Sequence, residues 1–117
     1  MLDEFLAEWQ LLSIFNSEPE LSDDAPWLYN CLHFERTVDL ITLSLTLEPA
    51  YEAATIELKH GSNRVLTLTL NRIEALFADP TFGQESLRFA FIDDANDDLI
   101  LTVTPSIAVT WGLKPRW

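Results

Sequence analysis

The stretch "ITLSLTLE", residues 41–48, decides the fold class, because apolar and polar residues alternate along its whole length. A period of two places successive side chains on opposite faces of a β-strand. The apolar face consists of Ile41, Leu43, Leu45 and Leu47. Glu48-Pro49 ends the strand, since proline has no backbone N–H to donate to a sheet. The sequence therefore predicts a half-buried strand with a polar outer face.

The same alternation recurs on both sides of this strand. Upstream, "WLYNCLHFER" (27–36) leads into it, and downstream the turn cluster "HGSN" (60–63) joins strands at 55–59 and 66–70. The apolar register then slips by one between Leu70 and Ile73, which predicts a bulge or a strand end near Asn71. For "IEALFADP" (73–80), a strand is favoured over a short helical turn. The last predicted strands are 87–91, 99–104 and 107–111.

The N-terminal segment has a different period. Apolar residues recur at spacings of three and four, which is the pattern of one helical face. They are Leu2, Phe5, Leu6, Trp9, Leu12 and then Phe15 or Asn16. This predicts an amphipathic helix over residues 2–16, followed by a loop over 17–26. The helix could dock into a partner's groove, but we expect it to cover the protein's own core.

Together these elements predict an α+β fold that is mainly β. An N-terminal amphipathic helix would pack on a curled antiparallel sheet of about six or seven strands, within a single domain (1–117) whose β-rich part is 27–112. A helix of that length spans about 22 Å, whereas six strands span about 29 Å. The sheet must therefore curl, fold over on itself or pair with another chain, which leaves a homodimer open.

Charge is the unusual property of this chain. It has 19 acidic and 7 basic residues, for a net charge of −12, and no lysine or arginine precedes Arg36. Such a surface repels nucleic acid and anionic membranes and speeds association with basic partners. The alternative is that the acidity serves solubility or reflects a salt-rich habitat. The acidic start of the chain and the lack of a bilayer-length apolar run predict a cytoplasmic protein.

Four aspartates fall between the strands at 87–91 and 99–104, where we expect a hairpin loop. They are Asp93, Asp94, Asp97 and Asp98. A calcium loop of the EF-hand type needs glycine at its sixth position and glutamate at its twelfth. Counted from Asp94, those positions hold Leu99 and Pro105, so the motif fails. We expect an acidic turn that binds a partner, with Asp23 and Asp24 as the next candidate patch.

The constellations that catalysis or cofactors require are missing. Glycine occurs at three positions, too few and too scattered for a phosphate-binding loop. Cys31 with His33 could act as a nucleophile and its base, but a buried inert thiol is favoured. His33 and His60 could also meet beside a glutamate, Glu35 or Glu57, as metal ligands, a signal no stronger than chance. The sequence predicts no enzyme activity, no metal site and no cofactor.

The order of elements resembles the small immunity proteins of bacterial polymorphic toxin systems. The resemblance rests on "FLAEWQLLSIF", "LHFER", "LITLSLTLEP", "VLTLTLNRIEAL", "SLRFAF" and "LILTVTPSIAVTW". It implies an acidic cytoplasmic protein that binds a cognate, basic toxin domain and blocks its active site. The alternative is a secretion chaperone or adaptor that binds an effector protein. A chaperone of that kind would carry a further helix near its C-terminus, where this chain has "TWGLKPRW".

Overall fold

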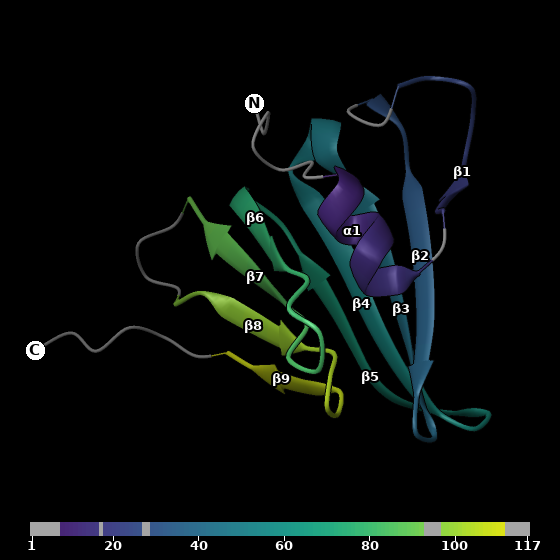
Figure 1. Cartoon of the computed structure of the whole chain (residues 1–117). Helices are drawn as coiled ribbons and strands as arrows, with labels where there is room; N and C mark the ends of the chain where they lie inside the picture. Colours follow the sequence, from purple (N-terminus) through teal and green to yellow (C-terminus); the bar gives the residue numbers. More distant parts are fainter. Residues whose placement is uncertain (1–7, 17, 27–28, 93–96, 112–117) are drawn as a thin grey trace, which may run out of the picture.

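Two antiparallel β-sheets make up most of the protein (Figure 1). The computed structural model describes residues 8–16, 18–26, 29–92 and 97–111. Sheet A has five strands: β1 (Glu20–Leu21), β2 (Leu32–Val38), β3 (Ile41–Glu48), β4 (Ala53–His60) and β5 (Asn63–Leu70). Sheet B has four: β6 (Ile73–Asp79), β7 (Ser86–Phe91), β8 (Leu99–Thr102) and β9 (Ala108–Thr110). A 3₁₀ turn, η3 (Pro49–Tyr51), joins β3 to β4.

The prediction of one curled sheet of six or seven strands is wrong, because the described chain forms nine strands in two sheets. The division falls at Asn71, where the sequence predicted a bulge or a strand end. Arg72 has a positive φ of 58°, which turns the chain out of sheet A. The Ile73 N–H then donates to the Glu52 carbonyl (3.0 Å) and the Ile92 N–H to the Arg72 carbonyl (2.9 Å). These bonds tie the start of sheet B to the end of sheet A.

The predicted helix is also corrected. Its described part, α1, runs from Glu8 to Phe15, and the calls on residues 2–7 lie outside the described residues. Leu11, Ile14 and Phe15 are its buried side chains, whereas Leu12, which the sequence placed on the apolar face, is half-buried. Apolar residues occur on most sides of this helix, so their spacing alone does not determine which side is buried. The prediction of a long amphipathic helix is therefore wrong for the described part, which is short and has apolar residues on most of its sides. The helix packs against β2 and β6, between the two sheets (Figure 1).

The alternation within the strands is confirmed. Leu43, Leu45 and Leu47 of β3 are buried, and the residues between them are half-buried. The inward faces of both sheets and of α1 form one core cluster. The strand predicted at 73–80 is β6, and β7 and β8 pair antiparallel as the two sides of the predicted hairpin.

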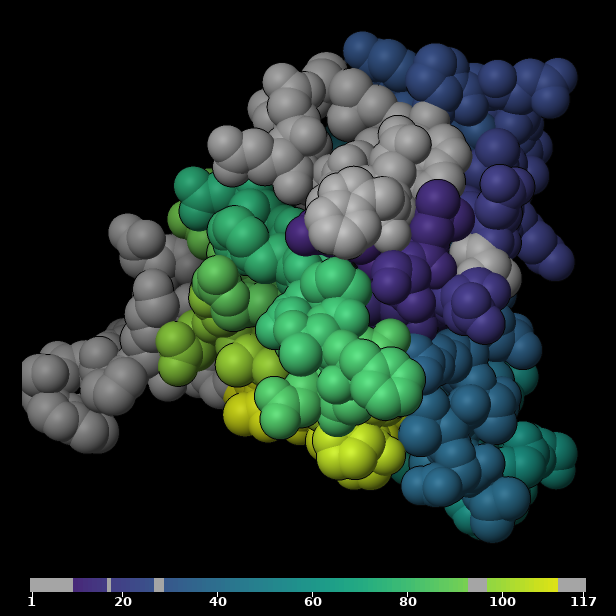
Figure 2. Space-filling model, viewed as in Figure 1, coloured from purple at the N-terminus to yellow at the C-terminus, as the bar shows by residue number. Residues whose placement is uncertain are grey.

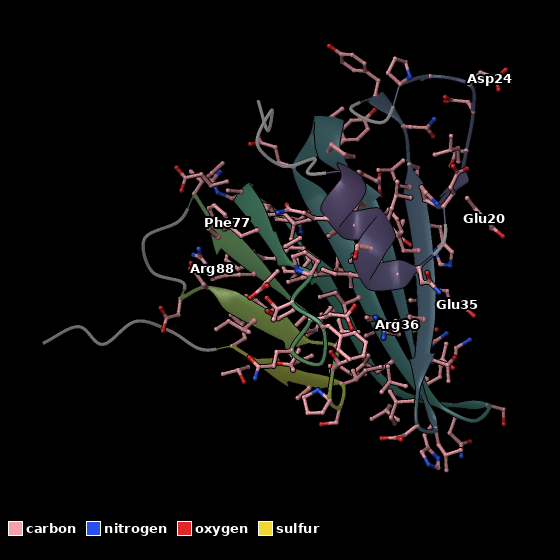
Figure 3. All side chains as sticks on the ribbon, in the orientation of Figure 1. Glu20, Asp24, Glu35, Arg36, Phe77 and Arg88 are labelled. Atoms are coloured by element: carbon pink, nitrogen blue, oxygen red, sulfur yellow. The ribbon has the colours of Figure 1, made fainter. Side chains whose placement is uncertain are left out.

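An ion pair joins the separate parts of the fold. Arg36 of β2 points from sheet A toward the loop before β7, where its Nη1 lies 2.9 Å from the Glu85 Oε2 (Figure 3). The same Nη1 donates to the Ile14 carbonyl at the end of α1. The Glu85 Oε1 accepts from the Thr104 hydroxyl (3.1 Å), just beyond β8. Since Glu85 is only 8% exposed, these partners take the place of water around its carboxylate.

Replacing Arg36 should therefore destabilise the whole molecule. In Arg36→Met, the Glu85 carboxylate stays buried without its cation, and we expect the free energy of unfolding to fall by about 3 kcal/mol. Urea denaturation followed by tryptophan fluorescence measures this change. The control is Arg64→Met, because the Arg64 guanidinium that pairs with Glu57 is exposed, and its loss should matter by less than about 1 kcal/mol. Equal effects of the two substitutions would contradict a joining role for Arg36.

Candidate partner-binding surfaces

The described residues of the two predicted acidic clusters, Asp23 and Asp24 in the first and Asp97 and Asp98 in the second, lie on different sides of the molecule. Figure 3 places Asp24, with Glu20 and Glu35, along the side of β1 and β2, and Arg88, which binds Asp98, on the opposite side. The same separation is visible in Figure 2, where the dark blue segment after α1 occupies the right side and the yellow-green residues of β8 and β9 the lower left. One compact partner contact does not cover both clusters.

The first surface is the acidic edge, which we define as Glu18, Glu20, Asp23, Asp24 and Glu35. Glu20 and Glu35 are exposed on the β1–β2 side of sheet A, where Glu20 pairs in register with His33. Together with Glu18 and His33 they line an open hollow of about 290 Å³. Three of these four lining residues are carboxylates, so the hollow attracts cationic groups.

A buried asparagine holds the loop that carries Asp23 and Asp24. Asn30 is 4% exposed, and its Oδ1 accepts from the backbone N–H groups of Ser22 (3.0 Å) and Cys31 (2.8 Å). Its Nδ2 donates to the carbonyls of Asp23 (2.9 Å) and Ala25 (2.8 Å). The loop is thus fixed before any partner arrives, which lowers the entropy lost on binding.

Two exposed tyrosines stand beside this loop. Tyr29 is 58% and Tyr51 is 78% exposed, and both line a hollow of about 220 Å³ together with Asp23 and Glu48. Cys31, for which the sequence favoured a buried inert thiol, lines the same hollow and is half-buried. Tyrosine offers a large rigid contact area and a hydroxyl, which is why it is common at protein interfaces.

The second predicted cluster is only partly described, because Asp93 and Asp94 lie outside the described residues. Asp98 is half-buried, and its Oδ2 lies 2.7 Å from the Arg88 Nη1. Asp97 is exposed, and its carbonyl accepts from the Trp111 indole N–H (3.1 Å). The carboxylate of Asp98 is therefore already paired within the molecule.

The described residues do not form the metal site that the sequence left open as an alternative. Within them, no group of three or more histidine, cysteine, aspartate or glutamate residues could hold a metal ion. His33 lies opposite Thr46 of β3, and Thr46 lies opposite Thr55 of β4. His60 is five residues beyond Thr55, so the two histidines lie about 16 Å apart along the strands.

Among the helices that the structure describes, none is long and apolar enough to span a membrane.

A tight turn follows β6 at the rim of sheet B. The Asp79 Oδ1 accepts from the Thr81 hydroxyl (2.5 Å) and from the Thr81 backbone N–H (3.0 Å). The hydroxyl, and after it the backbone N–H, lowers the pKa of the Asp79 carboxyl below its usual range. Asp79 thus keeps its negative charge at the rim of the sheet throughout the physiological pH range.

Several residues of these surfaces were missed by sequence reasoning. Tyr29 and Asn30 stand in an apolar-rich segment that was assigned to a strand, and Tyr51 belongs to the turn after Pro49. The available signal was Asn30 itself, because an asparagine close to a proline often hydrogen-bonds the backbone of a loop. The sequence analysis did not single out Arg88 either.

Comparisons with known proteins bear on the fold. No protein-family model matches the chain, and no curated protein matches its sequence. Among solved structures, a chain of the "Contact-dependent growth inhibition toxin - immunity protein complex from Klebsiella pneumoniae 342" matches with a TM-score of 0.77, covering 96% of this chain and 98% of that one. The two share a fold. Their sequence identity is 13%, so the likeness extends to architecture, and the resemblance drawn from the order of elements is confirmed at that level.

Asn30 should control the order of the acidic loop. In Asn30→Ala, four part-buried hydrogen bonds between the side chain and the backbone are lost, so we expect a stability loss of about 2 kcal/mol. Amide hydrogen exchange over residues 22–25 should accelerate at the same time. Asn71→Ala, at an exposed position between the sheets, is the control and should leave that exchange unchanged. Unaltered exchange in Asn30→Ala would contradict the conclusion that Asn30 fixes the conformation of this loop.

The pKa of Asp79 should respond to the Thr81 hydroxyl. Because the folded-state pKa lies below the unfolded one, this carboxylate stabilises the fold above the unfolded pKa, and the contribution is lost as pH falls through the folded value. Thr81→Val should raise the Asp79 pKa toward its ordinary value, measured by NMR titration of the carboxyl carbon. Thr67→Val, on the exposed face of sheet A, should leave that pKa unchanged.

Proposed function

We propose that this chain is an immunity protein that binds a cognate toxin domain in a stoichiometric complex and blocks the toxin's active site. The observation that carries the proposal is the match, over nearly the whole chain, to a member of a toxin–immunity complex. It agrees with the resemblance drawn independently from the order of apolar segments. The proposal assigns no chemistry to this chain; inhibition follows from covering a surface.

Charge supports the immunity role within such a pair. The net charge is −12, and the acidic edge presents carboxylates on an exposed side of the molecule (Figure 3). Such a surface suits a basic partner, because opposite fields accelerate the encounter of two proteins. A toxin domain that acts on nucleic acid carries the required positive surface. We place the complex in the cytoplasm, as the sequence predicts.

The acidic edge is the proposed site of electrostatic attraction. Asp23 and Asp24 were predicted partner-binding residues, and the structure sets them on a loop fixed by Asn30 beside Tyr29 and Tyr51. The hairpin acids contribute less in this proposal, because Asp98 already pairs with Arg88. Asp93, Asp94 and Asp97 remain proposed contacts at that second position.

The direct experiment uses the C-terminal domain encoded by the reading frame next to the one for this chain, here called the neighbouring-frame domain. Co-expression should protect cells from that domain, and the two proteins should co-purify at a one-to-one ratio. A complex in which the neighbouring-frame domain keeps its toxicity would instead support a chaperone or adaptor role. Absence of both binding and protection would contradict the proposed function.

Association should depend on salt and on the acidic edge. The variant Glu20→Gln/Asp24→Asn removes two exposed charges, so we expect the on-rate for the neighbouring-frame domain to fall about fivefold at low salt. The salt dependence of that rate should also weaken. Asp39→Asn/Glu74→Gln removes two exposed charges elsewhere and is the matched control. Equal on-rates for the two variants in stopped-flow measurements would assign the effect to net charge alone.

A further inference from the structure

The outer face of sheet B carries an apolar row where solvent-facing residues are expected to be polar. In register across three strands, Phe77 of β6 pairs with Arg88 of β7, and Arg88 pairs with Ile100 of β8. Phe77 is 43% and Ile100 is 40% exposed. Large apolar side chains that occupy neighbouring positions on a surface mark a site of interaction more often than scattered ones do.

Sheet A provides the comparison within the same molecule. At the equivalent central positions of its outer face, β3 and β4 present hydroxyl and charged side chains, namely Thr42, Ser44, Thr46, Thr55 and Glu57. An antiparallel sheet with one solvated face normally shows this pattern. Strand propensity does not explain the difference, since threonine serves an exposed strand as well as isoleucine does.

The row is held in a fixed arrangement. The Arg88 guanidinium lies over the Phe77 ring, 4.1 Å from its centroid, and its Nη1 lies 2.7 Å from the Asp98 Oδ2. Figure 3 shows Phe77 and Arg88 together on the side of the molecule away from the acidic edge. Phe77, Arg88 and Ile100, with Asp79 and Ser86, line a shallow hollow of about 310 Å³. A stiff aromatic–arginine pair beside a hollow has the composition of an interface centre.

We propose that this row, Phe77–Arg88–Ile100, is the anchor surface on which the toxin domain is held. The inference rests on the proposed function and adds to it a short-range contact on the side of the molecule away from the acidic edge. The occupant is a basic protein surface that presents an apolar side chain to the hollow. In this arrangement the acidic edge acts at long range on the encounter, and the row decides how long the complex lasts.

Charge favours the toxin over a second copy of this chain. Two carboxylates, Asp79 and Asp98, flank the row beside the guanidinium of Arg88, so its surroundings are net acidic. The Asp79 carboxylate is ionised at neutral pH, and the hydrogen bonds from Thr81 lower its pKa further. A second copy would bring the same acidic rim and a further net charge of −12, whereas a basic toxin surface complements the net negative charge around the row.

The size of the face sets what else the partner must touch. Four strands at about 4.8 Å and a six-residue strand at about 3.4 Å per residue make a face of roughly 400 Å². A stable protein complex buries about 800 Å² on each partner. The partner therefore extends beyond sheet B, and the base of the β7–β8 hairpin, with Asp97 and Trp111, is the adjoining surface.

The test measures dissociation of the neighbouring-frame domain from wild type and from Phe77→Ala, Ile100→Arg and Val65→Ala. Phe77→Ala should raise the dissociation rate about thirtyfold, which is the effect of losing a typical hot-spot side chain. Ile100→Arg should raise it about a hundredfold, because it adds bulk and a cation facing a basic partner. Val65 is 61% exposed on β5 of sheet A, and Val65→Ala should change the rate less than threefold.

The outcomes separate this inference from the proposed function. If wild type does not bind the neighbouring-frame domain, the proposed function fails and the anchor surface fails with it. If wild type binds and both sheet B variants dissociate as slowly as Val65→Ala, the inference alone is overturned. Hydroxyl-radical labelling of the wild-type complex gives a readout without substitution, and full labelling of Phe77 and Ile100 would overturn the inference. The inference would also be overturned if wild type is a dimer and Ile100→Arg converts it to a monomer, because the face would then serve self-association.

Discussion

The Arg36–Glu85 ion pair is the contact on which the arrangement of the fold depends. Apart from the backbone bond from Ile73 to Glu52, the described parts of sheet A, sheet B and α1 meet mainly through apolar packing, which is adjustable in angle. The guanidinium meets a carbonyl of α1 and a carboxylate of the β6–β7 loop, and that carboxylate also accepts from Thr104 beyond β8. Hydrogen bonds are directional, so this one site fixes the angle between two sheets that the core alone would leave variable.

Much of the strand structure could be predicted from the sequence, since alternation along β3 and β5 is a local property. The position of the break between the two sheets could be predicted, but its nature could not. A slip of register between Leu70 and Ile73 fits a bulge within one sheet as well as the end of a strand. The outcome was decided by the positive φ of Arg72, a conformation that nothing in an Asn-Arg-Ile sequence requires. The predicted buried face of α1 was wrong at Leu12 for a related reason. The contacts of the helix with both sheets decided which of its apolar side chains are buried.

The candidate surfaces were harder to predict than the fold. Acidic residues are numerous, so their positions in sequence said little about which of them gather in space. Asp23 and Asp24 join Glu20 and Glu35 because β1 pairs with β2, and that pairing involves two residues of a segment predicted as a loop. The row on sheet B depends on three strands in register, because Phe77, Arg88 and Ile100 come from three different strands and do not follow one another in sequence.

The order of strands has a consequence for how this fold tolerates change in length. In both sheets, along the part of the chain that the structure describes, each strand pairs with its neighbours in sequence, from β1 to β5 and from β6 to β9. An inserted residue at a hairpin tip therefore lengthens one turn and leaves the register of every other pair intact. Loops such as the two-residue link Asp39-Leu40 are then free to lengthen in relatives while the core stays in place. Relatives of this protein should differ in the lengths of their turns more than in the lengths of their strands.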